Sequence, residues 1–242
     1  VACVKWGTLY EPRYVNCLLY GLKEHLPVPF SFVCFTDDPK GLDAEVEVRS
    51  LPSHLRGWWG KAFLFSMEAG FPEGCRVLYL DLDLAIVGKL GKLLEFQGDF
   101  LTLSTAGIFC ELAPEGLNSS VILWTAGAKF APLFQRLSEA CLHYVHRFDH
   151  WLDMNLGAVP SVQEHCPGLV EDYSSRWLHS EEAVEAGGLW RANTGTVPKT
   201  LPLPRGVGIV NFPRNPKPSE VLQYHEWLQD YWNRGSAEEA KR

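Results

Sequence analysis

The apolar residues in the first half of the chain fall into short unbroken runs separated by stretches of helical spacing. The runs lie in the strands expected over residues 1–6, 31–36 and 77–80, and a further, shorter strand is expected over 46–51. Runs without polar alternation are typical of strands that are buried on both faces. Apolar positions at helical spacing predict helices over 12–26 and 58–69. This order predicts an α/β fold with a central, mostly parallel sheet flanked by helices.

The second half of the chain is less regular, and we find no internal repeat or linker in it. The elements expected there are strands over 100–104, 121–124 and 207–212, one long helix over 129–148, a helix from about Ser219 and a frayed tail over 235–242. Residues 156–204 are rich in Gly, Pro and Ser and are expected to form loops and short strands. We therefore expect a single domain over residues 1–242.

The predicted strand over 77–80 ends abruptly in two acids, Asp81 and Asp83. Residues i and i+2 of an extended segment point to the same side, so both carboxylates are expected to face one spot. Hard oxygen ligands at the carboxyl end of a strand suit Mg2+ or Mn2+ that carries a phosphorylated ligand. The alternative is a turn with two solvated acids, and the two acids alone do not decide between these interpretations.

Composition limits the classes of function. The chain has 242 residues, is 46% hydrophobic and carries a formal net charge of −7, which argues against a nucleic-acid partner. No apolar run approaches the roughly 20 residues of a membrane-spanning helix, and no signal peptide is recognised. We therefore expect no integral membrane segment and a cytoplasmic protein.

The seven cysteines are scattered among apolar neighbours, and none forms a Cys-x-x-Cys pair. This distribution predicts reduced core residues of an intracellular protein rather than a disulfide framework or a zinc site.

Two further polar groups follow the first and second predicted strands, at the same sheet edge as the acids. Lys5, Trp6 and Tyr10 surround the end of the first strand, where an aromatic ring could cover a base. Thr36 and Asp38 follow the second strand and could accept hydrogen bonds from a base or ribose. An ordinary turn, and an Asx turn ahead of the next proline, are the alternatives.

Lys61 is an isolated cation in the apolar helix start that also contains Trp58. Such a lysine is expected to have a specific anionic partner, either Asp81 or a phosphate group. Snorkelling of its ammonium to solvent is the alternative. Trp58 is suited either to core and lid packing or to contact with a ligand.

Polar residues near two later strands complete the set of candidates. Asn118 and Ser119 precede the strand over 121–124 and could bind sugar hydroxyls or cap a turn. The proline-rich loop that follows the late strand holds Arg214 and Lys217, and such a stiff, cation-bearing loop suits a pyrophosphate.

Three histidines, His143, His146 and His150, would share one face of the expected long helix. That face is away from the apolar one and lacks a His-Glu-x-x-His pattern, so we expect a solvated face rather than a zinc site. We assign no role to the histidines His54, His165, His179 and His225.

Taken in order, six segments resemble the nucleotide-sugar glycosyltransferases of the GT-A fold, especially bacterial members similar to glycosyltransferase family 8. The segments are VACVKWGTLY, FVCFTDDPKGL, GWWGKAFLF, VLYLDLDLAIVGKL, NSSVILW and VNFPRNPKP. The resemblance implies transfer of a sugar from a UDP- or GDP-sugar to a saccharide or other hydroxyl acceptor, with Mn2+ or Mg2+ as cofactor. It also implies a nucleotide-binding half over 1–104 and an acceptor or sugar half over 105–234.

The resemblance assigns roles residue by residue. Asp81 would contact ribose and metal, and Asp83 would bind the metal directly. The donor-binding residues that it implies are Lys5, Trp6, Tyr10, Thr36, Asp38, Trp58, Lys61, Asp81, Ser119 and Lys217. Asn118 would face the donor or acceptor sugar.

Two departures from the family pattern concern the metal and the reacting sugar. The family's late motif, close to HFxGxxKP or FHGxPKP, brings a histidine as the third metal ligand. This chain has Asn211 at the first register and Pro213 at the second, so we expect the Asn211 oxygen as the third ligand. The family's Asp-Gln-Asp run is also altered here, which leaves Asp149 and Asp153 as catalytic candidates alongside Asn118.

Two other classes of function remain open. A nucleotidyltransferase would share the architecture and the metal, but KWGTLYEP is a poor match to its glycine-rich loop after the first strand. A sugar- or nucleotide-binding module that has lost catalysis is the other alternative, and the missing histidine motivates it.

Overall fold

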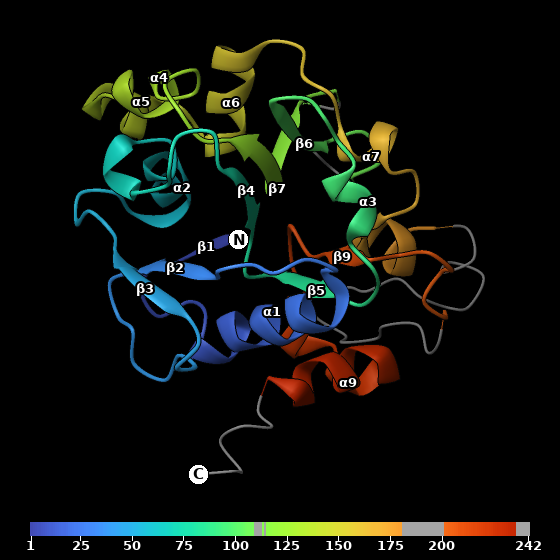
Figure 1. Cartoon of the computed structure of the whole chain (residues 1–242). Helices are drawn as coiled ribbons and strands as arrows, with labels where there is room; N and C mark the ends of the chain where they lie inside the picture. Colours follow the sequence, from blue (N-terminus) through green and yellow to red (C-terminus); the bar gives the residue numbers. More distant parts are fainter. Residues whose placement is uncertain (109–112, 114, 181–200, 236–242) are drawn as a thin grey trace.

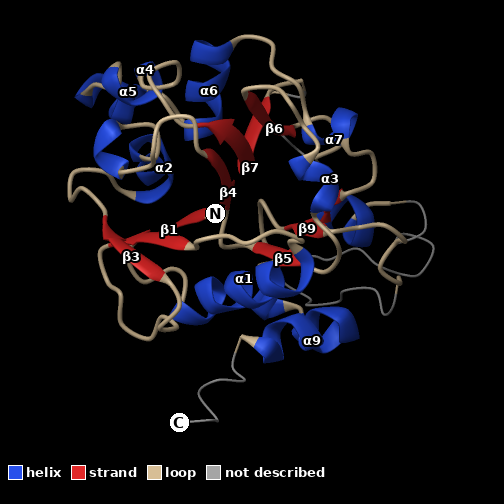
Figure 2. Ribbon diagram, viewed as in Figure 1, coloured by secondary structure: helices blue, strands red, loops and turns tan. Residues whose placement is uncertain are grey.

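The computed structural model describes residues 1–108, 113, 115–180 and 201–235, and the expected tail beyond 235 lies outside them. A six-stranded sheet in the order β3-β2-β1-β4-β7-β6 forms the centre, and helices cover both of its faces (Figures 1 and 2). Only β7 in this sheet runs antiparallel to its neighbours, which confirms the prediction of a mostly parallel sheet. The strands are β1 (Ala2–Lys5), β2 (Val33–Thr36), β3 (Glu47–Ser50), β4 (Arg76–Leu80), β6 (Phe100–Ser104) and β7 (Leu117–Thr125).

A second, three-stranded sheet lies beside the first, and the sequence did not predict it as a separate layer. Its strands, in spatial order, are β5 (Leu84–Ile86), β9 (Ile209–Asn211) and β8 (Val170–Asp172). The chain passes from β4 of the large sheet into β5 of the small sheet through residues 81–83. Asp81 therefore precedes a turn and Asp83 lies in it, instead of in the extended segment that we expected, because the chain changes sheets at this point.

The strands of the large sheet contribute alternate residues to two hydrophobic cores. In β4, Val77 and Tyr79 point into one core, and Leu78 and Leu80 point into the other. Burial of one such aliphatic side chain stabilises the fold by roughly 1.5–3 kcal/mol. Burial on both faces explains why the run over 77–80 shows no polar alternation.

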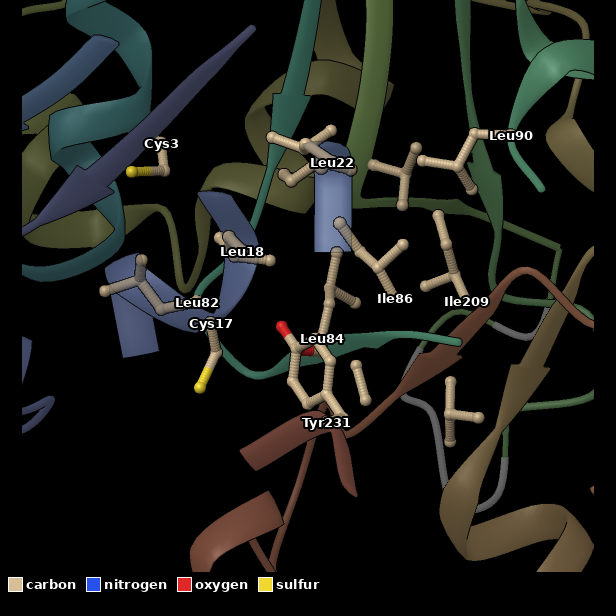
Figure 3. Close-up of a cluster of buried hydrophobic side chains, with 14 of the residues drawn as sticks. Cys3, Cys17, Leu18, Leu22, Leu82, Leu84, Ile86, Leu90, Ile209 and Tyr231 are labelled. Atoms are coloured by element: carbon tan, nitrogen blue, oxygen red, sulfur yellow. The ribbon is translucent and has the colours of Figure 1, made fainter. Parts of the chain in front are cut away.

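Different helices close the two cores. The first core lies between α1 (Pro12–His25), α9 (Glu226–Arg234) and the small sheet. Figure 3 shows Leu18 and Leu22 of α1 in the same cluster as Leu84 and Tyr231. The helices of the second core are α2 (Gly60–Phe63), α4 (Pro132–Gln135) and α6 (Phe148–Leu156).

The prediction of one long helix over 129–148 is wrong. The structure has three helices there, α4, α5 (Glu139–Tyr144) and α6. Ser138 is extended and its side chain accepts a hydrogen bond from the Cys141 amide, which caps the start of α5. Arg147 is also extended, with ψ of 163°, so α6 begins anew after it. Apolar spacing continues across these breaks because the segments pack on the same core.

The three histidines expected on one helical face are therefore distributed over separate elements. His143 and His146 are exposed and His150 is half-buried. The His146 ring centroid lies 5.7 Å from that of His150 and 6.4 Å from that of Trp58. Across the described ranges, no three His, Cys, Asp or Glu side chains form a group that could hold a metal ion.

The helix expected over 58–69 is interrupted as well. It consists of η1 (Gly57–Trp59), α2 and η2 (Met67–Ala69). Ser66 is extended and its hydroxyl accepts a hydrogen bond from the Ala69 amide, which starts η2 separately. The late helix begins at Glu226, later than predicted. The remaining short elements are α3 (Gly91–Leu94), α7 (Val162–His165), η3 (Ser174–Leu178), η4 (Pro218–Glu220) and η5 (Leu222–Tyr224).

The described cysteines are free thiols, as predicted, and Cys110 lies outside the described residues. Four of them, Cys3, Cys17, Cys34 and Cys166, are buried. Among the described helices, none is both long enough and apolar enough to cross a membrane.

His225, to which the sequence assigned no role, is buried among aromatic rings. It is 3% exposed, and its Nε2 lies 2.7 Å from the Tyr173 hydroxyl. The rings of Trp177 and Trp227 pack around it. Burial lowers the pKa of His225 from 6.5 to about 4.

We predict that His225 makes the free energy of unfolding depend on pH between 6.5 and about 4. In this window the unfolded chain binds a proton that the folded protein does not, so stability is full above pH 6.5 and falls as the pH falls. The loss is at most about 1.4 kcal/mol per pH unit. Urea unfolding of the wild type and of His225→Gln should show a shallower pH dependence for the variant. Equal slopes would contradict the assignment.

Candidate active site

A cavity of about 560 Å³ lies at the carboxyl end of β4. It brings together ten of the residues that the sequence predicted for the site. These are Trp6, Tyr10, Trp58, Lys61, Asp81, Asp83, Asn118, Ser119, Asp149 and Lys217. The predicted residues that do not line it are Lys5, Thr36, Asp38, Asp153 and Asn211. Although the turn geometry differs from the expected one, Asp81 and Asp83 do face the same cavity.

The antiparallel direction of β7 delivers its polar residues to the cavity. Because Leu80 of β4 pairs with Val121 of β7, the start of β7 lies beside the end of β4. The Asp81 amide donates a hydrogen bond of 2.8 Å to the Ser120 carbonyl, which fixes this register. Asn118 and Ser119 are therefore part of β7, which begins at Leu117, and do not precede the strand as expected.

Lys61 forms an ion pair with Asp81. Its Nζ lies 2.7 Å from Asp81 Oδ2 and also donates to Ser119 Oγ at 2.9 Å. The hydroxyl of Tyr79 donates to the other carboxylate oxygen at 2.5 Å. Burial raises the pKa of Asp81, Lys61 opposes this shift and the neighbouring Asp83 adds to it. From the sequence, the ammonium group of Lys61 could bind Asp81 or a phosphate group, or it could extend to solvent. In this structure its partner is Asp81.

Asp83 binds a second lysine. The Nζ of Lys217 lies 2.5 Å from Asp83 Oδ2 and also donates to the Phe212 carbonyl at 3.0 Å. The Tyr10 hydroxyl donates to the same carboxylate oxygen at 2.8 Å. Burial and the charge of Asp83 raise the pKa of Tyr10. The loop after β9 and the loop after β1 thus meet at one carboxylate.

Asp149 is held in place by Ser119. The amide and the hydroxyl of Ser119 donate to Asp149 Oδ1 at 2.8 and 2.5 Å. Because Ser119 also accepts from Lys61, a hydrogen-bonded chain connects Asp149 to Asp81 across the cavity. Arg147 lines the same side, with its Nη1 4.0 Å from Asp149 Oδ2.

Sequence reasoning missed Arg147 as a cavity residue. It lies at the start of α6, whereas the sequence placed it inside one continuous helix. Its position two residues before Asp149 could have indicated that it lies near the cavity. The wrong prediction of one long helix over 129–148 placed it inside that helix instead.

Three of the predicted residues that do not line the cavity, Lys5, Thr36 and Asp38, lie at the ends of β1 and β2 beside it. Lys5 is 3% exposed, and its Nζ lies 3.5 Å from the carbonyls of Gly7 and Asp38. Asp38 is exposed and accepts a hydrogen bond from the Lys40 amide, which is the Asx turn given above as the alternative. The Thr36 hydroxyl donates to the Asp38 carbonyl and completes this turn. In this structure, these three residues therefore make hydrogen bonds within the loops beside the cavity.

The two candidate positions for the third metal ligand, Asn211 and Pro213, have different surroundings in the structure. Asn211 is 1% exposed within β9, and its Oδ1 has no hydrogen-bond partner in the part of the chain that is described. Pro213 lines the cavity but has no side-chain atom that could bind a metal. The role of Asn211 as a metal ligand stays a prediction.

Comparison with solved structures supports the fold. The chain is similar to GlyE, a glycosyltransferase of Streptococcus pneumoniae TIGR4, with a TM-score of 0.61 and 16% identity over 97% of this chain and 60% of GlyE. It is also similar to the galactosyltransferase LgtC, solved with donor and acceptor sugar analogs, with a TM-score of 0.56 and 13% identity over 98% of this chain and 96% of LgtC. An active-site mutant of LgtC gives a TM-score of 0.57 at 10% identity.

The sequence itself matches no protein-family model and no curated protein. The chain spans about 60% of the length of GlyE. At these identities the likeness shows the fold, and it confirms the fold class that the resemblance implied.

Asp153, the second acid of α6, binds the backbone of β7 outside the cavity lining. Its Oδ1 accepts a hydrogen bond from the Leu117 amide at 2.9 Å, and burial raises its pKa. We predict that Asp153→Ala lowers the free energy of unfolding by about 1–3 kcal/mol, because it leaves this amide without its partner. Asp153→Asn keeps an oxygen acceptor and is the matched control in urea unfolding. Equal effects of the two variants would rule out this anchoring role.

Proposed function

We propose that this protein transfers a sugar from a nucleotide-diphosphate sugar, a UDP- or GDP-sugar, to a hydroxyl group of a saccharide or other acceptor. One observation carries the proposal: a cavity in a glycosyltransferase-like fold gathers two acids at the end of β4, a third acid held by Ser119, and two lysines. The complex of LgtC with donor and acceptor sugar analogs supports such substrates for a cavity in this fold.

The proposal includes a divalent cation, Mn2+ or Mg2+, held by Asp81 and Asp83. These residues fit such an ion, because their hard carboxylate oxygens line the same cavity. The described residues place no third acid, His or Cys in a metal-binding group with them, so diphosphate oxygens and water would supply further ligands. A cation bound there would stabilise the charge that develops on the diphosphate leaving group.

Different cavity residues are proposed to bind the diphosphate and the base or sugar of the donor. Lys61 and Lys217 are proposed to neutralise the diphosphate, since both ammonium groups lie beside the acids that would hold the ion. Trp6 is 36% exposed and Trp58 is 47% exposed at the cavity, so each could stack on a base or a sugar face. Tyr10 completes the base side of the proposed site.

Asp149 is the residue that we propose to contact the reacting sugar. It lines the cavity, and two hydrogen bonds from Ser119 fix its carboxylate. Asn118, whose Oδ1 accepts a hydrogen bond from the Ser120 amide, is proposed to face the same sugar.

A binding module without catalysis is the second candidate function. Pro213, at the second of the two registers for the family's histidine, favours it, because it lines the cavity and has no ligating side chain. Calorimetry with a nucleotide sugar and Mn2+, followed by an assay of donor hydrolysis, separates the two functions. Tight binding without turnover on any acceptor would favour the module.

We predict that Asp83→Ala abolishes Mn2+-dependent binding of UDP or GDP and leaves the fold intact. The carboxylate of Asp83 is a proposed direct ligand of the ion, so its loss removes half of the protein's charged ligands. Thermal shift with each nucleotide, with and without Mn2+, measures the effect. Asp99→Ala, which removes an exposed acid paired with Lys129, is the matched control. Full Mn2+-dependent binding by Asp83→Ala would refute the metal assignment.

We predict that Asp149→Asn lowers kcat by about 100-fold or more, the usual size of a lost acid–base or charge contribution. The amide keeps the acceptor for Ser119, so the affinity for the donor should change little. Asp153→Asn, on the same helix, is the matched control and should keep its turnover. Similar losses of kcat in both variants would show that the cavity lining does not identify the reacting acid.

A further inference from the structure

Each acid of the 81–83 turn has a lysine of its own. Lys61 lies 2.7 Å from Asp81, and Lys217 lies 2.5 Å from Asp83. The four side chains are between 10% and 21% exposed, so water solvates them poorly. A poorly solvated charge without a partner is costly, and these lysines therefore act as built-in counter-ions.

The lining of the cavity is neutral as a whole. Its described residues include three cations and three acids. The cations are Lys61, Arg147 and Lys217, and the acids are Asp81, Asp83 and Asp149. A divalent cation that arrives alone meets carboxylates already neutralised by lysines. A diphosphate that arrives alone meets lysines already bound to carboxylates.

We infer that Lys61 and Lys217 are exchangeable counter-ions, which neutralise the acids in the empty cavity and turn to the diphosphate when a divalent cation binds the acids. This inference rests on the proposed function. It implies that a lysine has opposite effects on the two ligands: it competes with the cation when the cation is alone, and it supports the cation when the diphosphate is present.

The coupling between the two ligands therefore has a part that depends on the lysines. Cation and diphosphate attract each other in any site, but this direct attraction does not need a lysine to change partners. The change of partner by the lysines adds to this attraction. Each ion pair has to be separated only once, and the same separation frees the acid for the cation and the lysine for the diphosphate. By linkage, each ligand raises the affinity of the other by the same factor.

The test uses Mn2+ and inorganic pyrophosphate, which need no knowledge of the base or sugar. Free Mn2+ is measured by electron paramagnetic resonance, with the protein-free titration subtracted. The affinity for Mn2+ is determined with and without saturating pyrophosphate, in the wild type and in Lys217→Met. Lys129→Met, which removes an exposed lysine paired with Asp99, is the matched control.

We expect Lys217→Met to bind Mn2+ alone at least about fivefold more tightly and pyrophosphate alone more weakly, in line with usual coupling between sites. With pyrophosphate present, the gain in Mn2+ affinity should disappear, so that the coupling factor falls. The control should match the wild type. Lys61→Met should show the same pattern through Asp81, and it serves as the test if Lys217→Met does not fold.

Two results would overturn the inference. An Mn2+ affinity that rises equally with and without pyrophosphate would show that the lysine stays on its acid. An unchanged Mn2+ affinity would show that the lysine does not compete with the cation. If the wild type bound neither Mn2+ nor pyrophosphate, separately or together, the proposed function itself would fail.

Discussion

The end of β4 is the constraint on which the rest of the site depends. A strand buried on both faces ends in two carboxylates beside two hydrophobic cores, and these charges require partners. Lys61 comes from α2, 20 positions before Asp81, whereas Lys217 comes from the loop after β9, 134 positions after Asp83. The two ion pairs therefore form only when α2 and the small sheet are both docked against the large sheet. The cavity is therefore complete only when both sheets are in place.

The sequence was sufficient to predict those features of the fold and the site that depend on a single physical effect. Apolar runs predicted β1, β2 and β4 because the sheet is covered on both faces at these strands. An isolated lysine in an apolar helix start suggested an anionic partner, with solvent as the alternative, and Lys61 pairs with Asp81. The breaks between α4, α5 and α6 were not predictable in this way. They arise from extended backbone at Ser138 and Arg147, while the apolar spacing continues on both sides of each break.

The choice between Asp149 and Asp153 shows where sequence reasoning ends. The two acids lie four positions apart on α6, on the same side of the helix, and both reach β7. Asp149 receives hydrogen bonds from Ser119, and Asp153 receives one from Leu117, two positions earlier in the strand. The position of α6 along β7 decides which acid reaches the cavity. That position is a tertiary property, set by packing on the second core, and no local pattern encodes it.

The charges also explain why acids and lysines are present together. The chain carries a net charge of −7, and the cavity lining is neutral, so a dianionic diphosphate meets no attraction from the protein as a whole. Lysines without the acids would attract the anion but would be without their anionic partners in the empty cavity. Acids without the lysines would bind a cation at the cost of buried, unpaired charge in its absence. Paired in one cavity, the two sets leave none of these buried charges without a partner in the empty protein, and the proposed divalent cation would supply the positive charge that an anionic ligand needs.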